Sequence, residues 1–265
     1  MKSSFYFLCR CWILTILLLT SNDMCAQKKL PRQCYQLTSY RYTTPVQEAI
    51  LDHYLQQALL PALHRATIKN IGVFKAIAND TASGKLLFVL VPLRDANQLV
   101  HIHHKLATDS AYLQNGAAYL NAPHNEPVYQ RIEVQLLQAF EKAPVMNLPQ
   151  LKAERHNRVY ELRSYESASE QLFASKVHMF NEGDEIGLFK RLNFNAVFYS
   201  TALAGSHMPN LVYMTSFESM ADRDEHWKAF VADDYWKKLV AMPQYQHNMQ
   251  HMDVYLLRPT TYSDY

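Results

Sequence analysis

Charged and imidazole side chains that are able to move protons gather between His178 and Arg191. His178 and Glu182 are four residues apart, so a helix would place both on one face. Either side chain could act as a general base, while Lys190 or Arg163 holds an anionic oxygen of a substrate. Charged helix ends are also common on protein surfaces. An exposed, ion-paired helix end is therefore the alternative interpretation.

A second group of candidate residues surrounds His226. Its imidazole could serve as a base or as an axial haem ligand. The neighbouring aromatic residues Trp227, Phe230 and Trp236 are more typical of packing between a helix and a sheet. We therefore expect no resident cofactor, with haem on His226 as the alternative.

Histidines are numerous, twelve in the chain, so metal binding has to be considered. His101 and His104 are spaced i, i+3, and His247 and His251 form another close pair. Neither pair has a carboxylate or a cysteine at a recognised ligand spacing, and the sequence contains no His-Glu-x-x-His pattern. The sequence therefore predicts surface histidines and no metal site.

The elements that must position these side chains repeat along the chain. Residues 34–40 (CYQLTSY) return as residues 159–165 (VYELRSY), an offset of 125, and both alternate apolar and polar side chains like half-buried strands. Shorter echoes follow: residues 73–74 return at an offset of 124, residues 86–88 at 125, and residues 134–137 at 120. These echoes indicate a tandem duplication.

Each half shows the order strand, helix, strand, strand, helix, strand, which is the ferredoxin-like plan. We expect a first half over residues 33–142, a linker over 143–157 and a second half over 158–260. One face of each antiparallel sheet has no helices, yet its apolar side chains must be covered. The sequence therefore predicts an α+β chain whose two halves pack sheet to sheet as a dimeric α/β-barrel around a cavity, within one chain.

Alternation along the strand at residues 159–165 separates two sets of side chains. If Tyr160 and Leu162 pack under the helices, then Glu161, Arg163 and Tyr165 point into the cavity. A buried Arg–Glu pair there would be costly unless it is paired or solvated, which makes Arg163 a candidate site residue.

The complete predicted site joins these groups. Its catalytic residues are Arg163, Glu182 and His226. Its ligand-binding residues are Glu161, Tyr165, His178, Lys190 and Tyr199.

Residues 1–26 have the pattern of a secretory signal peptide: basic Lys2 and Arg10, a short apolar core and the small residue Ala26 at the expected cut. We expect an exported protein, periplasmic or secreted, with no membrane association after cleavage. Cys34 is the one cysteine beyond this segment, which predicts no internal disulfide.

Charge argues against a nucleic-acid partner. The chain carries 26 Lys and Arg against 24 Asp and Glu, for a formal net charge of +2, and no block of basic residues occurs. We expect a small-molecule ligand as the main partner. A homodimer of the duplicated chain would also be compatible with this composition.

The second half resembles the NIPSNAP family, within the dimeric α/β-barrel superfamily. The resemblance is carried by residues 160–165 (YELRSY), 189–194 (FKRLNF), 210–214 (NLVYM) and 221–230 (ADRDEHWKAF). It implies the barrel fold, but the family has no agreed reaction, and superfamily relatives include cofactor-independent oxygenases and haem-binding or haem-degrading proteins. The first half resembles a diverged copy.

Three functional hypotheses follow. The first is a barrel that binds a small, partly apolar ligand, with metal-independent oxygenase-like or isomerase-like chemistry. The second is a non-catalytic interaction module whose barrel is filled by Phe198, Tyr213 and Phe217. The third is haem binding through His226.

Overall fold

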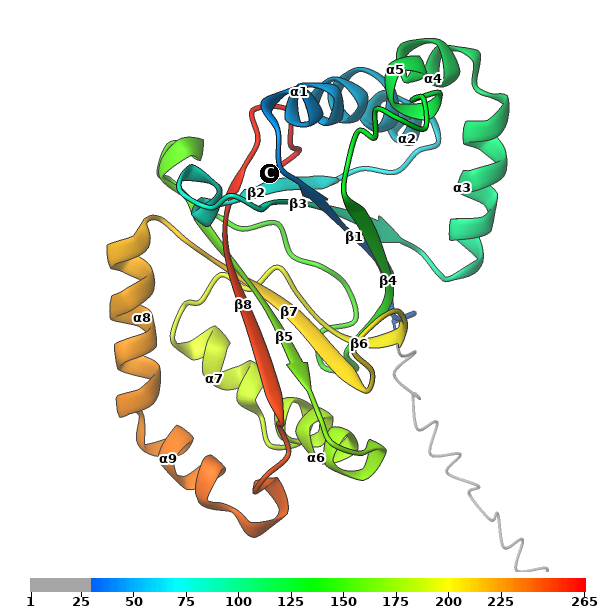
Figure 1. Cartoon of the computed structure of the whole chain (residues 1–265). Coiled ribbons are helices and arrows are strands. Elements are labelled where there is room, and N and C mark those ends of the chain that lie inside the picture. The colour runs from blue at the N-terminus through cyan, green and yellow to red at the C-terminus, as the bar shows by residue number, and fades with distance from the viewer. Residues whose placement is uncertain (1–29) are drawn as a thin grey trace, which may run out of the picture. The chain divides into compact units, whose positions relative to one another are not determined.

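Residues 30–265 are described by the computed structural model, so the predicted signal peptide lies outside the described residues. The first half begins with a strand and ends with a strand, and its helices lie on one side of the sheet (Figure 1). Its elements are β1 (Cys34–Tyr42), α1 (Pro45–His53), the π-helical turn η1 (Tyr54–Leu59), α2 (Leu60–Arg65), β2 (Gly72–Ala76), the 3-10 turn η2 (Ile77–Asp80), β3 (Lys85–Leu93), α3 (Asn97–Thr108), α4 (Ser110–Asn115), α5 (Ala117–Leu120) and β4 (Arg131–Ala139).

The second half repeats this order after a segment with one short 3-10 turn, η3 (Arg155–Asn157). None of the helices in the described residues combines the length and apolarity needed for a membrane span. The elements of the second half are β5 (Val159–Glu166), α6 (Glu170–Asn181), α7 (Glu185–Arg191), β6 (Phe198–Ala204), β7 (Asn210–Phe217), α8 (Met220–Ala232), α9 (Asp234–Ala241), the 3-10 turn η4 (Pro243–Tyr245) and β8 (His251–Pro259).

Within residues 30–265 the strands close into one antiparallel barrel, in the order β1-β3-β2-β8-β5-β7-β6-β4. Each half supplies a four-stranded sheet, β4-β1-β3-β2 and β8-β5-β7-β6, as the ferredoxin-like plan requires. The two sheets join edge to edge: β2 pairs with β8 through Phe74 and Pro259, and β4 pairs with β6 through Ala139 and Ser200. The predicted intrachain α/β-barrel is confirmed.

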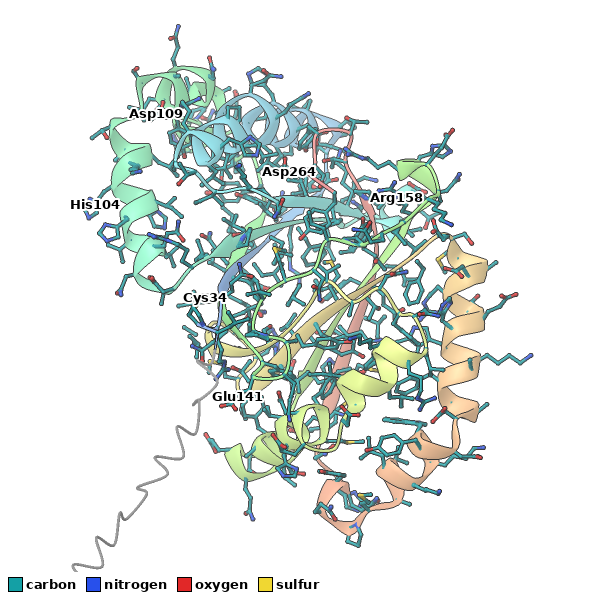
Figure 2. All side chains as sticks on the ribbon, turned by 180° about the vertical axis from the view of Figure 1, so that it is seen from behind. Cys34, His104, Asp109, Glu141, Arg158 and Asp264 are labelled. Carbon is teal, nitrogen blue, oxygen red and sulfur yellow. The ribbon has the colours of Figure 1, made fainter. Side chains whose placement is uncertain are left out.

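Local capping explains where several helices start and stop. Thr44 accepts a hydrogen bond from the backbone N–H of Gln47 at 3.2 Å, and Pro45 takes the first helical position, so α1 starts at Pro45. Asp109, labelled in Figure 2, separates α3 from α4, because its carboxylate accepts a hydrogen bond from the backbone N–H of Tyr112 at 2.9 Å. A second helix pair is divided in the same way. Asp233 is extended and its carboxylate accepts from the backbone of Tyr235, which ends α8 and starts α9.

The alternation of β5 was recognised, but its two faces were assigned the wrong way round. Tyr160 and Leu162 lie in the core between the sheets, whereas Glu161, Arg163 and Tyr165 face the helices. A narrow barrel interior favours the uncharged set, while the helix layer can offer side-chain donors to a carboxylate. The core of the barrel interior comes from both halves and includes Tyr35, Leu37, Phe74, Phe88, Tyr160, Leu162 and Phe198.

Residues 260–265 return to the barrel and become part of its core. The carboxylate of Asp264 accepts a hydrogen bond from the backbone N–H of Ile71 at 2.7 Å. This contact places the ring of Tyr265 against Phe74 and Tyr160, with ring centroids 5.3 and 5.8 Å away. Tyr265 is 5% exposed, so its ring is a core side chain.

Replacing Tyr265 with Ala should therefore lower the free energy of unfolding by about 3 kcal/mol, because removing a buried aromatic ring typically costs about 3–5 kcal/mol. Tyr265→Phe keeps the ring and loses one long contact to Met146 Sδ at 3.9 Å, so it should stay within about 1 kcal/mol of wild type. Urea denaturation measures both. An unchanged urea midpoint for Tyr265→Ala would show that this segment does not contribute to the barrel core.

Candidate functional site

Glu161 is a fully buried carboxylate at the centre of a polar network beneath α8. Its Oε1 accepts hydrogen bonds from Arg163 Nε at 2.6 Å and Arg223 Nη2 at 3.1 Å. Its Oε2 accepts from Arg223 Nε and from Trp227 Nε1, each at 2.7 Å. Burial raises the pKa of this carboxyl group, but the hydrogen bond from Arg223 and the charge of Arg163 outweigh burial and hold the pKa below its ordinary value.

Arg163 continues this network along the sheet. Its guanidinium lies 3.9 Å from the centre of the Trp227 ring, and its Nη1 donates to Tyr165 OH at 2.9 Å. The hydroxyl groups of Tyr165 and Tyr213 are 2.7 Å apart. Arg223 and Trp227 come from α8, whereas Glu161 and Arg163 come from β5. The network therefore attaches α8 to the sheet. The catalytic role predicted for Arg163 stays a prediction.

A second buried ion pair lies in the same layer. Lys176 Nζ of α6 is 3.3 Å from Glu185 Oε2 of α7, and both side chains are at least nine-tenths buried. Burial raises the pKa of the Glu185 carboxyl group, and the nearby Lys176 opposes that rise. Sequence reasoning missed this pair, because its members are on two helices that no periodic pattern relates.

The remaining predicted residues are spread over several places. His178 and Glu182 line a groove of about 530 Å³ between α6 and β4, outside the barrel. His178 Nδ1 is 2.9 Å from Tyr245 OH, and Glu182 is exposed. Lys190 is exposed as well, while Tyr199 is buried in the aromatic core under the helices. The structure therefore does not bring the predicted residues together into one site.

His226 was the predicted base and the alternative haem ligand. Its Nδ1 is 2.7 Å from the backbone oxygen of Asp222, and its ring packs against Phe194 and Phe217. It does not line the cavity of the barrel. These surroundings hold the imidazole between a helix and a sheet and do not fit a haem.

A partly open cavity of about 250 Å³ lies in the mouth of the barrel, where β1 and β5 end and β4 and β8 begin. It is smaller than the groove beside α6 but less open to water, so it removes more of a ligand from solvent. Its floor is largely apolar and consists of Leu37, Leu86, Phe88, Leu162, Val212 and Tyr255. Its rim is polar and consists of Ser39, Arg41, Glu133, Gln135, Ser164, His207, His251 and Asp253.

Both halves contribute to this cavity through residues that the duplication relates. Leu37 and Leu162 are equivalent in the two opening strands, as are Ser39 and Ser164, and all four line the cavity. The barrel is therefore not completely filled, whereas a core without a cavity would have favoured the interaction-module hypothesis. Of the three residues proposed to fill it, Phe198 lies in the interior, while Tyr213 and Phe217 pack under the helices.

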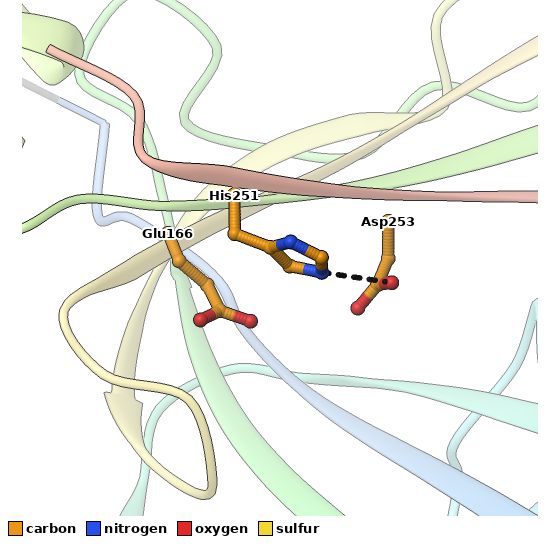
Figure 3. A group of neighbouring side chains, drawn as sticks. All are labelled: Glu166, His251 and Asp253. Atoms are coloured by element: carbon orange, nitrogen blue, oxygen red, sulfur yellow. Dashed lines mark hydrogen bonds and ion pairs between the residues drawn. The ribbon is translucent and has the colours of Figure 1, made fainter. Parts of the chain in front are cut away.

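The rim contains imidazole and carboxylate groups that sequence reasoning did not select. His251 Nε2 is 3.3 Å from Asp253 Oδ1, and Glu166 lies beside them (Figure 3). His207 Nδ1 is 3.0 Å from Glu166 Oε1. The available signal was the spacing of His251 and Asp253: two residues apart in a strand, they share one face.

Comparison with protein families finds a similarity in the second half. The NIPSNAP family model matches residues 160–264. Comparison with curated proteins gave no match. Among solved structures, a NIPSNAP family protein of unknown function from Agrobacterium tumefaciens is 23% identical and covers 41% of this chain and 93% of its own, with a TM-score of 0.35.

Two other solved structures match almost the whole chain. A proposed monooxygenase from Lactobacillus acidophilus is 11% identical, covers 86% of this chain and 94% of its own, and has a TM-score of 0.55. An anthrone oxidase-like protein is 10% identical, covers 86% of this chain and 92% of its own, and has a TM-score of 0.50. At these identities the likeness concerns the fold.

Replacing Glu161 with Gln should lower the free energy of unfolding by about 3 kcal/mol near pH 7, because two largely buried guanidinium groups lose their shared carboxylate, while Arg223 keeps another carboxylate partner, in Asp224. Since folding lowers the pKa of Glu161, its contribution is present above the unfolded pKa of roughly 4.3 and is lost as the pH falls through the folded pKa. The difference between wild type and variant should therefore be constant above about pH 5 and shrink below it.

Urea denaturation at a series of pH values measures this difference. Glu182→Gln is the matched control, because the same exchange is made on an exposed side chain, and it should unfold like wild type. A gap between wild type and Glu161→Gln that persists unchanged down to pH 3 would contradict the proposed charge pairing.

Proposed function

We propose, for a chain whose residues 160–264 form a NIPSNAP domain, that the barrel cavity binds a small, partly apolar molecule. The observation that carries this proposal is a partly open cavity of about 250 Å³ with an apolar floor and a polar rim. A cavity of about 150 Å³ can hold benzene, so this volume accommodates a ring system with a polar substituent.

The lining also suggests how such a ligand would be oriented. Apolar side chains on the floor, such as Phe88 and Leu162, would contact the rings of the ligand. The hydroxyl groups of Ser39 and Ser164 and the guanidinium of Arg41 would face its polar substituent. Polar groups placed beside an apolar surface are the usual means by which a pocket fixes the orientation of a ligand.

The chemistry that we assign to this cavity is proton abstraction from a carbon next to a carbonyl group. The C–H bond breaks, the proton passes to the carboxylate of Glu133, and the electron pair spreads onto the carbonyl oxygen near Arg41. This step is common to metal-independent oxygenase-like and isomerase-like reactions. We assign the base to Glu133 in place of Glu182 and His226, because Glu133 lines the cavity.

The compartment remains a proposal from the sequence alone. We propose that the protein acts after export, on the basis of the signal-peptide pattern in residues 1–26. A small, partly apolar ligand would then be met in the periplasm or outside the cell.

Filling the cavity tests ligand binding. Ser39→Phe should weaken binding of 2-naphthol, a small hydroxylated aromatic probe, at least tenfold, because the new ring occupies the space of the ligand. Fluorescence titration measures the affinity, and Ser39→Leu should give a smaller loss. Ser83→Phe makes the same exchange at an exposed position in the β2–β3 connection and should bind like wild type.

Equal affinity in wild type and Ser39→Phe would place the probe elsewhere and reject the cavity as its site. Thermal unfolding of each variant without probe separates a filled cavity from an unfolded protein.

The role of Glu133 is tested with anthrone, a fused-ring ketone with acidic C–H bonds, chosen because one structural neighbour is anthrone oxidase-like. Wild type should accelerate oxygen uptake by anthrone, and Glu133→Gln should slow that uptake about 100-fold while still binding 2-naphthol. Glu154→Gln removes an exposed carboxylate and should leave the rate unchanged. An unchanged rate in Glu133→Gln would exclude this residue as the base.

A further inference from the structure

Three possible metal ligands lie together on one face of two paired strands at the rim of the barrel cavity. Glu166 of β5 is directly opposite His251 of β8, and Asp253 lies two residues further along β8. Figure 3 shows the three side chains on the same side of the strands, with the imidazole between the two carboxylates. A donor atom from each lies within 4.8 Å of the other two.

One oxygen of the Glu166 carboxylate is buried without a hydrogen-bond donor from any residue that the structure describes. Its Oε1 is shielded from solvent and has no hydrogen-bond partner within the described residues, although His207 Nδ1 is 3.0 Å away. That nitrogen lies at ion-pair distance but outside hydrogen-bonding geometry. A shielded carboxylate oxygen without a donor is unfavourable, and a cation would stabilise it.

The donor set indicates which kind of cation fits. Calcium and magnesium prefer oxygen ligands alone, whereas one imidazole with two carboxylates suits zinc, manganese or ferrous iron. Donors bound to one such ion at about 2.1 Å cannot be more than about 4.2 Å apart. The present spacing therefore needs small side-chain rotations, which an exposed side chain such as His251 can make.

We propose that Glu166, His251 and Asp253 bind one divalent transition-metal ion of the zinc or manganese class at the rim of the cavity. Three protein ligands leave further coordination positions open. An ion there could polarise an oxygen atom of a molecule in the cavity. The proposal needs only these three side chains, and it does not depend on the identity of the small-molecule ligand or on the base Glu133.

Zinc titration of the purified chain, after removal of metals with a chelator, tests this site. Isothermal titration calorimetry should show one strong zinc site per chain and a much weaker response to magnesium. His251→Asn should weaken that site at least tenfold. His247→Asn makes the same exchange four residues away, on an exposed side chain, and should bind zinc like wild type.

Two further variants separate this site from the proposed ligand cavity. Glu166→Gln should weaken zinc binding at least tenfold while 2-naphthol still binds, because Glu166 is not among the residues that line the cavity. Asp253→Asn should also weaken zinc binding at least tenfold. Ser39→Phe should lose 2-naphthol and keep zinc. Thermal unfolding without zinc should be alike for wild type and His251→Asn. Absence of a strong zinc site in wild type, or equal weakening by His251→Asn and His247→Asn, would overturn the metal proposal and leave cavity binding untouched.

Discussion

Each half of this chain has a sheet with one face covered by helices and one apolar face that nothing in the same half can cover. Exposed apolar area of that extent is unfavourable in water. Closing the two sheets edge to edge removes both faces from water at once and pairs the outer strands, so that β2 meets β8 and β4 meets β6. The cavity, its rim and the aromatic core all follow from this closure.

The face of the second sheet that packs against the helices is stabilised by paired charged groups. Charged groups lie inside the protein there, and each is stabilised by a specific partner, as Glu161 is by Arg163, Arg223 and Trp227. The residues that carry the resemblance to the NIPSNAP family are therefore largely those that attach α8 to the sheet. In this chain the residues that resemble the NIPSNAP family hold the helices against the second sheet. The cavity lies on the opposite face of the same strands.

The barrel could be predicted from the sequence because period-2 alternation and an internal repeat are local signals. Local sequence does not determine which face of a strand points into the barrel. For this reason the prediction assigned the two faces of β5 the wrong way round. The predicted alignment of β3 with β7 was also wrong by one residue. An offset of 125 matches Phe88, which lies in the barrel interior, with Tyr213, which lies under the helices. The strand register gives an offset of 124. The rim was missed because Arg41 and Glu133 belong to the first half and Asp253 to the second, so that all three line one cavity only after the barrel closes.

Fusion of the two halves has a consequence for the symmetry of whatever occupies the cavity. In a barrel made from two identical chains, every group beside the ligand would occur twice, and a ligand could enter in two equivalent orientations. Here the serines have stayed the same, but Arg41 in one half corresponds to Glu166 in the other. The guanidinium at the end of β1 therefore corresponds to a carboxylate at the end of β5, so two opposite orientations of a bound molecule would no longer be equivalent.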